Sequence, residues 1–156
     1  MEKINLSKST KDILNKREGK KIVFTNGCFD LLHRGHLSYL ADAAALGDYL
    51  IVGLNSDESV SGLKGPSRPI SNQEDRKFFL ESLKSVASVE VFYDETPLAL
   101  IESISPDVLV KGGDYQIDNI VGKDHVFSKG GEVLTIPFID GYSSTKLIEK
   151  IVQSGQ

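Results

Sequence analysis

Short apolar runs alternate with segments of helical periodicity along most of this chain. The run at residues 49–54 is almost unbroken, which is typical of a strand buried on both faces of a parallel sheet. Shorter runs of the same kind lie at residues 22–25, 89–93, 108–111 and 133–137. This alternation predicts a single α/β domain built on a Rossmann-like, doubly wound, five-stranded parallel sheet.

Helices are expected between these strands, and several of their ends carry recognisable signals. Ser71 followed by Glu74 forms a capping box before one helix, and Thr96 precedes a proline at the start of the next. Gly47 is a stop signal after the helix that ends at Leu46. Further helices are expected at residues 7–17, 119–127 and 144–152. Residues 1–19 are predicted to form a helical appendage to a main domain at residues 20–156.

Residues 55–69 lack a clear period. The segment is polar and contains several glycines and prolines, so it is predicted to be a loop of functional length. Lys64 lies within it, next to Gly65, where a mobile cation could close over an anionic ligand. A solvated loop lysine without a function is the alternative.

The carboxyl ends of the strands identify the expected binding edge. Right-handed crossovers place all these ends at one edge of a parallel sheet, and ligands bind at that edge in open α/β folds. Here the edge collects four polar segments, at residues 25–27, 55–57, 111–113 and 140–143.

One of these turns, from Asn26 to His36, carries two histidines. It lies between an apolar strand and residues 37–44, which have helical spacing, so the histidines sit on a strand-to-helix turn. The free backbone N–H groups of a helix start favour phosphate, and Gly35 lets a ligand come close. Two imidazoles in this position therefore suit contact with a phosphate chain.

This turn resembles the GxFDxxHxGH signature of the cytidylyltransferase-like nucleotidyltransferases, and every fixed position is present between Gly27 and His36. The resemblance implies transfer of a nucleotidyl group from a nucleoside triphosphate to an anionic acceptor. Such a reaction needs no protein nucleophile, because donors placed around the α-phosphate stabilise the charge. Each of His33 and His36, donating to phosphate oxygens, could contribute about 3 to 4 kcal/mol in the transition state. Histidines satisfied by the backbone at a helix start are the alternative.

Other residues of the turn leave two roles open. Asp30 could orient a histidine or a metal-bound water, or it could cap the turn. Cys28 is interpreted as a packing residue, because a reactive thiol needs exposure and a depressed pKa. A zinc site on the histidines lacks its remaining ligands, so no protein metal site is predicted. Mg²⁺ bound together with the triphosphate is expected instead.

The composition of the chain limits the classes of molecule that it is expected to bind. The formal net charge of −4 and the isoelectric point near 5.4 argue against a nucleic-acid binder. Anionic small substrates fit if the basic residues gather locally, and the candidates are Lys64, Arg68, Arg76 and Lys111. The sequence has no apolar run near 18 residues and no secretory leader, so no membrane association is predicted. The single cysteine fits a reducing compartment, and a cytoplasmic protein is expected.

Further runs narrow the resemblance. Together, residues 55–57, 63–70, 74–76, 110–115 and 141–145 resemble the D-glycero-β-D-manno-heptose 1-phosphate adenylyltransferases. The resemblance implies that ATP and a sugar 1-phosphate give ADP-heptose and pyrophosphate by in-line attack, a step in lipopolysaccharide or surface-glycan synthesis. Many relatives carry this domain behind a sugar kinase, so the chain is interpreted as the separate adenylyltransferase or an excised domain. A homo-oligomer, in the simplest case a dimer, is expected.

The resemblance also assigns roles to individual residues. His33 and His36 would contact the triphosphate, and Lys64 would stabilise charge as the third catalytic residue. The residues that would bind the nucleotide are Asn26, Gly27, Cys28, Phe29, Lys111, Gly112, Gly113, Asp114, Tyr142, Ser143, Ser144 and Thr145. The residues that would bind the sugar phosphate or support its loop are Asn55, Asp57, Arg68 and Arg76.

Three other functions are weighed. Glycerol-3-phosphate cytidylyltransferase has the same phosphate machinery with CTP and a smaller acceptor, but the runs around Lys64 and Lys111 argue against it. A non-catalytic nucleotide-sensing domain would keep the fold, yet both histidines and Lys64 are present. A dinucleotide-binding dehydrogenase is excluded because no GxGxxG follows the first strand.

Overall fold

A five-stranded parallel sheet forms the centre of the computed structural model, which describes residues 4–113 and 115–155. The strands are β1 (Ile22–Gly27), β2 (Tyr49–Asn55), β3 (Ser88–Phe92), β4 (Val108–Gly112) and β5 (Glu132–Ile136). Their order in the sheet is β3-β2-β1-β4-β5, and every neighbouring pair is parallel. The predicted sheet is therefore confirmed.

The strand order reverses next to β1. The chain adds β2 and β3 on one side of β1 and then crosses over to add β4 and β5 on the other. In doubly wound sheets a ligand crevice opens at such a reversal, between the carboxyl ends of the two strands. The turn that carries the two histidines leaves β1, and the glycine pair at 112–113 leaves β4, so the fold brings these two segments to the same crevice.

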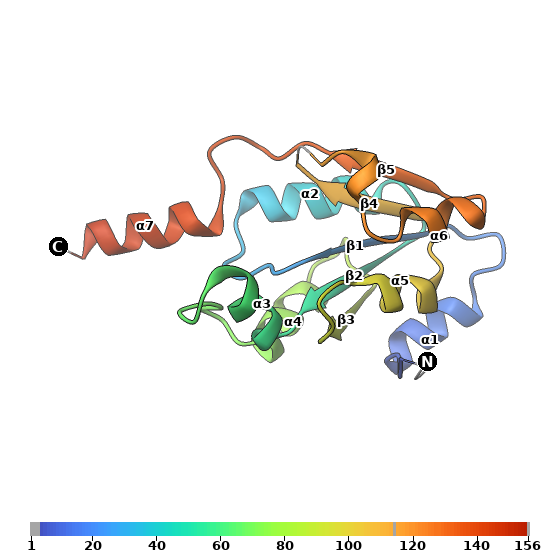
Figure 1. The fold of residues 1–156 in the computed structure, drawn as a ribbon, viewed down its shortest axis with the longest axis horizontal. Helices are drawn as coiled ribbons and strands as arrows, with labels where there is room; N and C mark the ends of the chain where they lie inside the picture. Colours follow the sequence, from blue (N-terminus) through green and yellow to red (C-terminus); the bar gives the residue numbers. More distant parts are fainter. Residues whose placement is uncertain (1–3, 114, 156) are drawn as a thin grey trace.

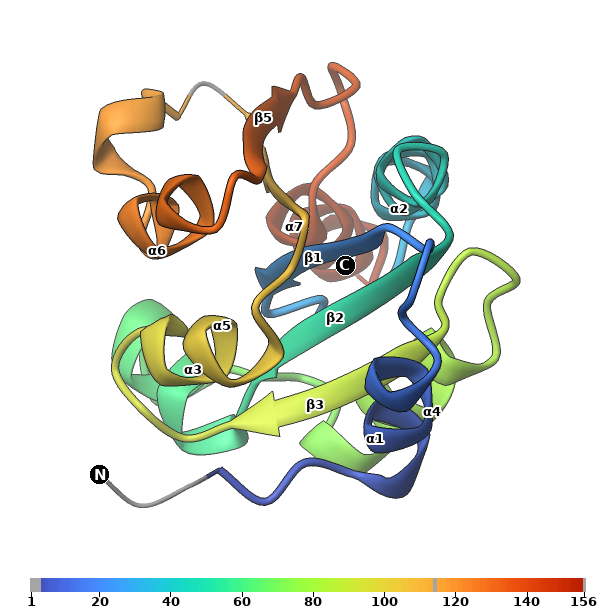
Figure 2. The ribbon, with the colours of Figure 1, turned by 90° about the vertical axis from the view of Figure 1, so that its right-hand side faces the viewer.

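Helices cover both faces of the sheet (Figures 1 and 2). In chain order the helical elements are α1 (Lys8–Asn15), α2 (Arg34–Ala44), α3 (Asp57–Lys64), α4 (Gln73–Glu81), α5 (Leu98–Ile104), the 3-10 helix η1 (Ile117–Asn119), α6 (Lys123–Ser128) and α7 (Ser144–Ser154).

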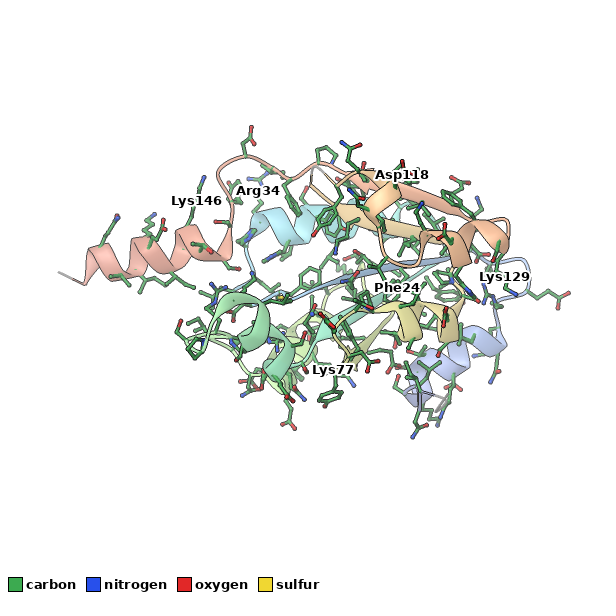
Figure 3. All side chains as sticks on the ribbon, viewed as in Figure 1. Phe24, Arg34, Lys77, Asp118, Lys129 and Lys146 are labelled. Atoms are coloured by element: carbon green, nitrogen blue, oxygen red, sulfur yellow. The ribbon has the colours of Figure 1, made fainter. Side chains whose placement is uncertain are left out.

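Alternate residues of the strands enter two separate cores. Val23 of β1 packs with Tyr39 and Leu40 of α2, while its neighbour Phe24 packs with Ile101 of α5 on the opposite face. Figure 3 shows Phe24 in the interior, in agreement with its complete burial. This alternation follows from the pleat of a strand, which points successive side chains to opposite faces.

The main correction to the predicted elements concerns residues 55–69. Residues 57–64 form helix α3 rather than a loop. Ser56 caps the helix by accepting a hydrogen bond from Ser59 N, and Gly65 ends it with a φ of 100°. The helical period escaped detection because Val60 is the only fully buried residue in it. Lys64 therefore ends a helix and is not part of a free loop.

Other boundaries move by smaller amounts. Helix α4 is capped by Asn72, whose side chain accepts from Asp75 N, one residue beyond the predicted capping box. Phe78 and Phe79 of this helix are 67% and 44% exposed. The predicted helix at 119–127 is instead η1 followed by α6.

Helix α1 and its N-cap supply hydrogen-bond partners to buried polar side chains of β3. Thr10, which is fully buried, shares a 2.6 Å hydrogen bond with Ser88, and Ser7 Oγ donates to Glu90 over 2.6 Å. The division at residues 19 and 20 into an appendage and a main domain stays a prediction.

Helix α7 leaves the body at the end where α2 begins and projects away from it (Figure 1). Its apolar residues Ile151 and Val152 are 62% and 58% exposed. Within the described residues, no helix combines the length and the apolar character needed to cross a membrane.

Candidate active site

Two adjoining cavities open at the carboxyl edge of the sheet. The larger, about 340 Å³, lies between the ends of β1 and β4. The smaller, about 190 Å³, lies between the first turns of α2 and α7. The residues that line both are His36, Lys64, Phe138 and Ser144. An elongated ligand could therefore extend from one cavity into the other.

His33 is the N-cap of helix α2 and stabilises its first turn. Its Nδ1 accepts a hydrogen bond from the backbone N of His36 over 3.4 Å, so a neutral His33 carries its proton on Nε2 and can donate it to a ligand. The imidazole rings of His33 and His36 stack with their centroids 3.8 Å apart. The helix-capping alternative is thus part of the geometry, and it orients the ring without occupying the donor.

Gly35 allows this stack to form. A Cβ at this position would lie 2.9 Å from the His33 ring and 3.0 Å from Cβ of Tyr142. Both distances are too short for a side chain to be added without movement. The glycine of the signature therefore provides close packing between the histidines and the segment before α7.

His36 is held in an environment that disfavours its charged form. Burial, the neighbouring His33 and the positive Lys64 together lower the pKa of His36 to about 4. Its Nδ1 is buried without a hydrogen-bond partner among the described residues, and its ring meets Phe29 edge to face at 5.3 Å. A buried polar atom without a hydrogen-bond partner costs free energy of folding. A ligand in the cavity would change the polarity and charge around the His36 ring.

Two lysines supply positive charge to the cavities. Lys64 reaches them from the end of α3 and lines both, while Lys111 lines the larger one from β4. Burial lowers the pKa of Lys111, and its Nζ lies 4.9 Å from the centre of the Tyr115 ring. These lysines are the local positive charge that an anionic substrate requires on an acidic protein.

Phe138 is a lining residue that the sequence analysis did not identify. It follows β5, is 61% exposed, and lines both cavities. Its ring lies against Gly112 and Gly113, where a Cβ on Gly113 would be 2.7 Å from the ring. The signal in the sequence was its place just after a predicted strand, at the binding edge, where an apolar side chain has no core to enter.

The hydroxyl groups at the start of α7 divide into different roles. Ser143 caps the helix by accepting from Lys146 N, and Ser144 Oγ donates to the carbonyl of Leu31 over 2.8 Å. Thr145 is exposed and lines the smaller cavity. Tyr142 stacks on His33 with a centroid distance of 6.1 Å. The start of α7 is thereby joined to the histidine turn.

Most of the predicted nucleotide residues meet in these cavities. Asn26, Cys28 and Phe29 line the larger one, as do Gly27 and Gly112. Burial raises the pKa of Cys28, although Lys64 and Arg76 act against this shift. A protonated, half-buried thiol fits the interpretation of Cys28 as a packing residue. The predicted residue Asp114 lies outside the described residues.

The four residues predicted for the sugar phosphate lie outside the linings of the two cavities. The described residues that line the two cavities do not include Asn55, Asp57, Arg68 or Arg76. Arg76 is completely buried and donates to Cys28 O, Asn55 O, Ser71 O and the Asp57 carboxylate. This geometry supports the alternative role that was considered for them, support of the surrounding loops.

Asp30 has a structural set of partners rather than a free carboxylate. Burial acts to raise the pKa of Asp30, but hydrogen bonds from the Ser71 and Ile70 amides and from Arg68 outweigh it and lower the pKa. Among the described residues, no group of three or more His, Cys, Asp or Glu side chains is placed to hold a metal ion.

Comparison with known proteins agrees with this geometry. A family model described as cytidylyltransferase-like matches residues 24–150. The bifunctional protein HldE of Syntrophotalea carbinolica is 52% identical over 152 residues, and that of a Marinomonas species is 54% identical over 147. These matches cover 96% and 91% of this chain. The chain spans about 31% of the length of each relative.

Solved structures show the same fold. A lipopolysaccharide core biosynthesis protein from Thermoplasma volcanium superposes with a TM-score of 0.63 at 25% identity, covering 80% of this chain and all of that one. Thermotoga maritima TmcAL, bound with alpha-thio ATP, gives a TM-score of 0.60 at 12% identity over 86% of this chain and 51% of its own. The fold, the histidine turn and the family match agree, and the chain belongs to the cytidylyltransferase-like family.

Proposed function

We propose that this chain transfers AMP from ATP to D-glycero-β-D-manno-heptose 1-phosphate, forming ADP-heptose and releasing pyrophosphate. One observation carries the proposal. The stacked rings of His33 and His36 lie at the start of helix α2 and line a cavity that Lys64 also lines. This arrangement suits a polyphosphate. The similarity to HldE and to a lipopolysaccharide core biosynthesis protein supports the choice of acceptor.

The reaction is a single displacement at phosphorus. A phosphate oxygen of the sugar phosphate attacks the α-phosphorus of ATP, and the bond from that phosphorus to the oxygen that bridges to the β-phosphate breaks. Pyrophosphate leaves with the bond's electrons. Because the attacker and the leaving group are both negative, positioned donors and cations lower the barrier most. His33 Nε2, His36 and Lys64 are the groups that would supply this stabilisation.

The two cavities suggest how ATP would lie. The larger one, between Asn26 and Gly112, has aromatic and glycine walls that suit adenosine. The smaller one, at the first turns of α2 and α7, suits the outer phosphates, because helix starts present free N–H groups. The α-phosphate would then lie near His36 and Lys64, where the cavities meet.

Mg²⁺ is proposed to enter with ATP. The only carboxylate lining the larger cavity within the described residues is Asp30, whose oxygens already accept from Arg68, Ile70 and Ser71. This donor set fits a cation held mainly by substrate phosphates, the binding mode that Mg²⁺ favours. There the cation would neutralise phosphate charge.

A pyrophosphate-release assay tests the proposal. ATP or CTP is paired with heptose 1-phosphate or glycerol 3-phosphate, in four combinations. Release with ATP and heptose 1-phosphate alone supports the proposal. Release with CTP and glycerol 3-phosphate would instead identify a glycerol-3-phosphate cytidylyltransferase. Nucleotide binding without release in any combination would favour a sensing domain.

Assembly and location remain predictions. A homo-oligomer would be detected by light scattering of the purified chain, and α7 offers Ile151 and Val152 as exposed apolar side chains. The expected cytoplasmic location needs fractionation of the producing cells.

A further inference from the structure

A buried ion pair joins the histidine turn to the segment that follows Lys64. Asp30 is 2% exposed, and its carboxylate accepts hydrogen bonds from Arg68 Nε at 2.7 Å, Ile70 N at 2.9 Å and Ser71 N at 3.0 Å. All these donors belong to residues 68–71. One side chain of the signature therefore holds the whole return from α3 towards α4.

The contact continues from residue 68 back to α3. Ser61 Oγ donates to the carbonyl of Arg68 over 2.6 Å, and Arg68 N donates to the carbonyl of Gly65 over 3.1 Å. Gly65 is the residue that ends α3 immediately after Lys64. Asp30 is thus linked to the last turn of α3 through Arg68.

The first turn of α3 is fixed to the same part of the histidine turn. Arg76 Nη2 donates to the Asp57 carboxylate at 2.7 Å, while its Nη1 donates to Cys28 O at 2.7 Å and to Asn55 O at 2.8 Å. Helix α3 is consequently attached at both ends to residues 28–30. The base of Lys64 has a defined position relative to His33 and His36.

A contribution to the stability of the fold does not explain why a charged pair, Asp30 and Arg68, holds this segment. Replacing a buried ion pair by well-packed apolar side chains of similar volume is often neutral or stabilising. The ion pair also leaves Arg68 Nη2 buried with no hydrogen-bond partner in the part of the chain that the structure describes, which is a cost. What a carboxylate adds is direction, because its lone pairs fix the register of the two amides and the guanidinium that approach it.

We propose that Asp30 is a positioning residue, which acts through Arg68 and α3 to hold Lys64 at the α-phosphate. This inference rests on the role given to Lys64 in the proposed function. Asp30 itself touches neither substrate nor the reacting atoms in this proposal. A displacement of about 1 Å at a catalytic group can cost roughly 100-fold in rate, so an anchor at this place has a large effect on turnover.

A double-mutant cycle tests the proposal. Turnover of ATP and the sugar phosphate is measured for the wild type, Asp30→Asn, Lys64→Ala and the double variant. We expect Lys64→Ala to lower kcat roughly 100-fold, as loss of one stabilising group does. Asp30→Asn should lower kcat about 10- to 100-fold with little change in the KM for ATP. In the Lys64→Ala background the same Asp30 substitution should cost less than about threefold, because coupled sites are not additive.

Asp107→Asn is the matched control. Asp107 also accepts from a backbone amide, Ile22 N at 2.8 Å, and from an arginine, Arg17 at 3.3 Å, but it precedes β4 at the opposite edge of the sheet. Its substitution should change the melting temperature and leave kcat within about twofold in both backgrounds, because Asp107 lies at the opposite edge of the sheet from the two cavities and is not coupled to Lys64.

The outcomes distinguish a failure of the positioning role of Asp30 from a failure of the catalytic role of Lys64. If Asp30→Asn lowers kcat by the same factor with and without Lys64, the positioning role is wrong and the role of Lys64 stands. If Lys64→Ala leaves kcat unchanged, the role of Lys64 in the proposed function fails, and the inference fails with it. Should Asp30→Asn not fold, Arg68→Gln replaces it in the same cycle, since it removes the ion pair and leaves the Asp30 carboxylate to the two amides.

Discussion

His33 caps the helix on which His36 lies, with its Nδ1 accepting from the backbone N of His36 over 3.4 Å. The capping bond uses one ring nitrogen and leaves the other for a ligand. A single side chain therefore combines a structural role with a proposed catalytic one, and suitable substitutions separate the two.

Substitutions of His33 should divide stability from turnover. Asparagine is among the best N-cap residues and alanine is poor, with a difference of about 1 kcal/mol. His33→Asn should keep the wild-type melting temperature and lower kcat roughly 100-fold, because it loses the Nε2 donor. His33→Ala should lose a similar factor in kcat and also melt at a lower temperature. Melting curves and pyrophosphate release check both; equal turnover of His33→Asn and the wild type would remove His33 from the chemistry.

The protonation of His36 should respond to the triphosphate. In the free protein its pKa is about 4, so the ring is neutral near pH 7. An anionic phosphate next to the ring favours the charged form, and the pKa should rise when ATP binds. Histidine NMR titrations with and without a non-hydrolysable ATP analogue measure the shift. An unchanged titration curve would mean that no phosphate lies beside this ring.

The lowered pKa of His36 also predicts how the stability of the fold changes with pH. Between pH 6.5 and about pH 4 the unfolded chain protonates His36 while the folded chain does not, so folding loses stability as the pH falls through this range. His36→Ala should remove this contribution and lower turnover strongly while leaving the melt near pH 7 almost unchanged. Melting temperatures at several pH values compare the variant with the wild type; identical acid sensitivity of the two proteins would contradict the burial of His36.

Gly35 should tolerate no side chain. Its added Cβ would lie 2.9 Å from the His33 ring, and overpacking of this kind costs about 1 to 3 kcal/mol. Gly35→Ala should therefore displace His33 or Tyr142 and lower kcat. Gly62→Ala is the control, because this glycine lies within α3 and an added Cβ there would have no neighbour within 4 Å among the described residues. Comparable kcat values for the two variants would show that the histidine stack has no part in turnover.

Phe138 should contribute to nucleotide binding. Its exposed ring lines both cavities and covers the glycines after β4, so Phe138→Ala should raise the KM for ATP several-fold with a smaller effect on kcat. Aromatic contact with a base contributes about 1 to 3 kcal/mol in nucleic-acid complexes, which bounds the effect. Phe78→Ala, at a side chain that is 67% exposed on α4, is the control. A KM that changes equally in both would exclude Phe138 from the ATP site.

Sequence patterns were sufficient for the sheet and for the turn that carries the histidines. The strands are nearly continuous apolar runs, and the fixed spacing of Gly27, His33 and His36 is enough to indicate the family. These features depend on local order along the chain. Local order is what periodicity and motif spacing report.

Features that depend on contacts between distant segments could not be predicted. Helix α3 has little apolar periodicity because Asp57 and Ser61 of this helix make polar bonds to Arg76 and Arg68, which in turn bond to the histidine turn. Arg76 has the character of a substrate-binding residue in the sequence, yet its donors are used by four backbone and side-chain acceptors that only the fold brings together. Phe138 became a candidate only when its ring was found against Gly112 and Gly113.

A crystal structure with a non-hydrolysable ATP analogue would show directly whether the two histidines bind the triphosphate. We expect the phosphates to lie at the first turn of α2, within hydrogen-bonding distance of His33 Nε2 and His36, with Lys64 Nζ on the same phosphates. Phosphates bound away from both imidazoles, with adenosine outside the crevice between β1 and β4, would contradict it.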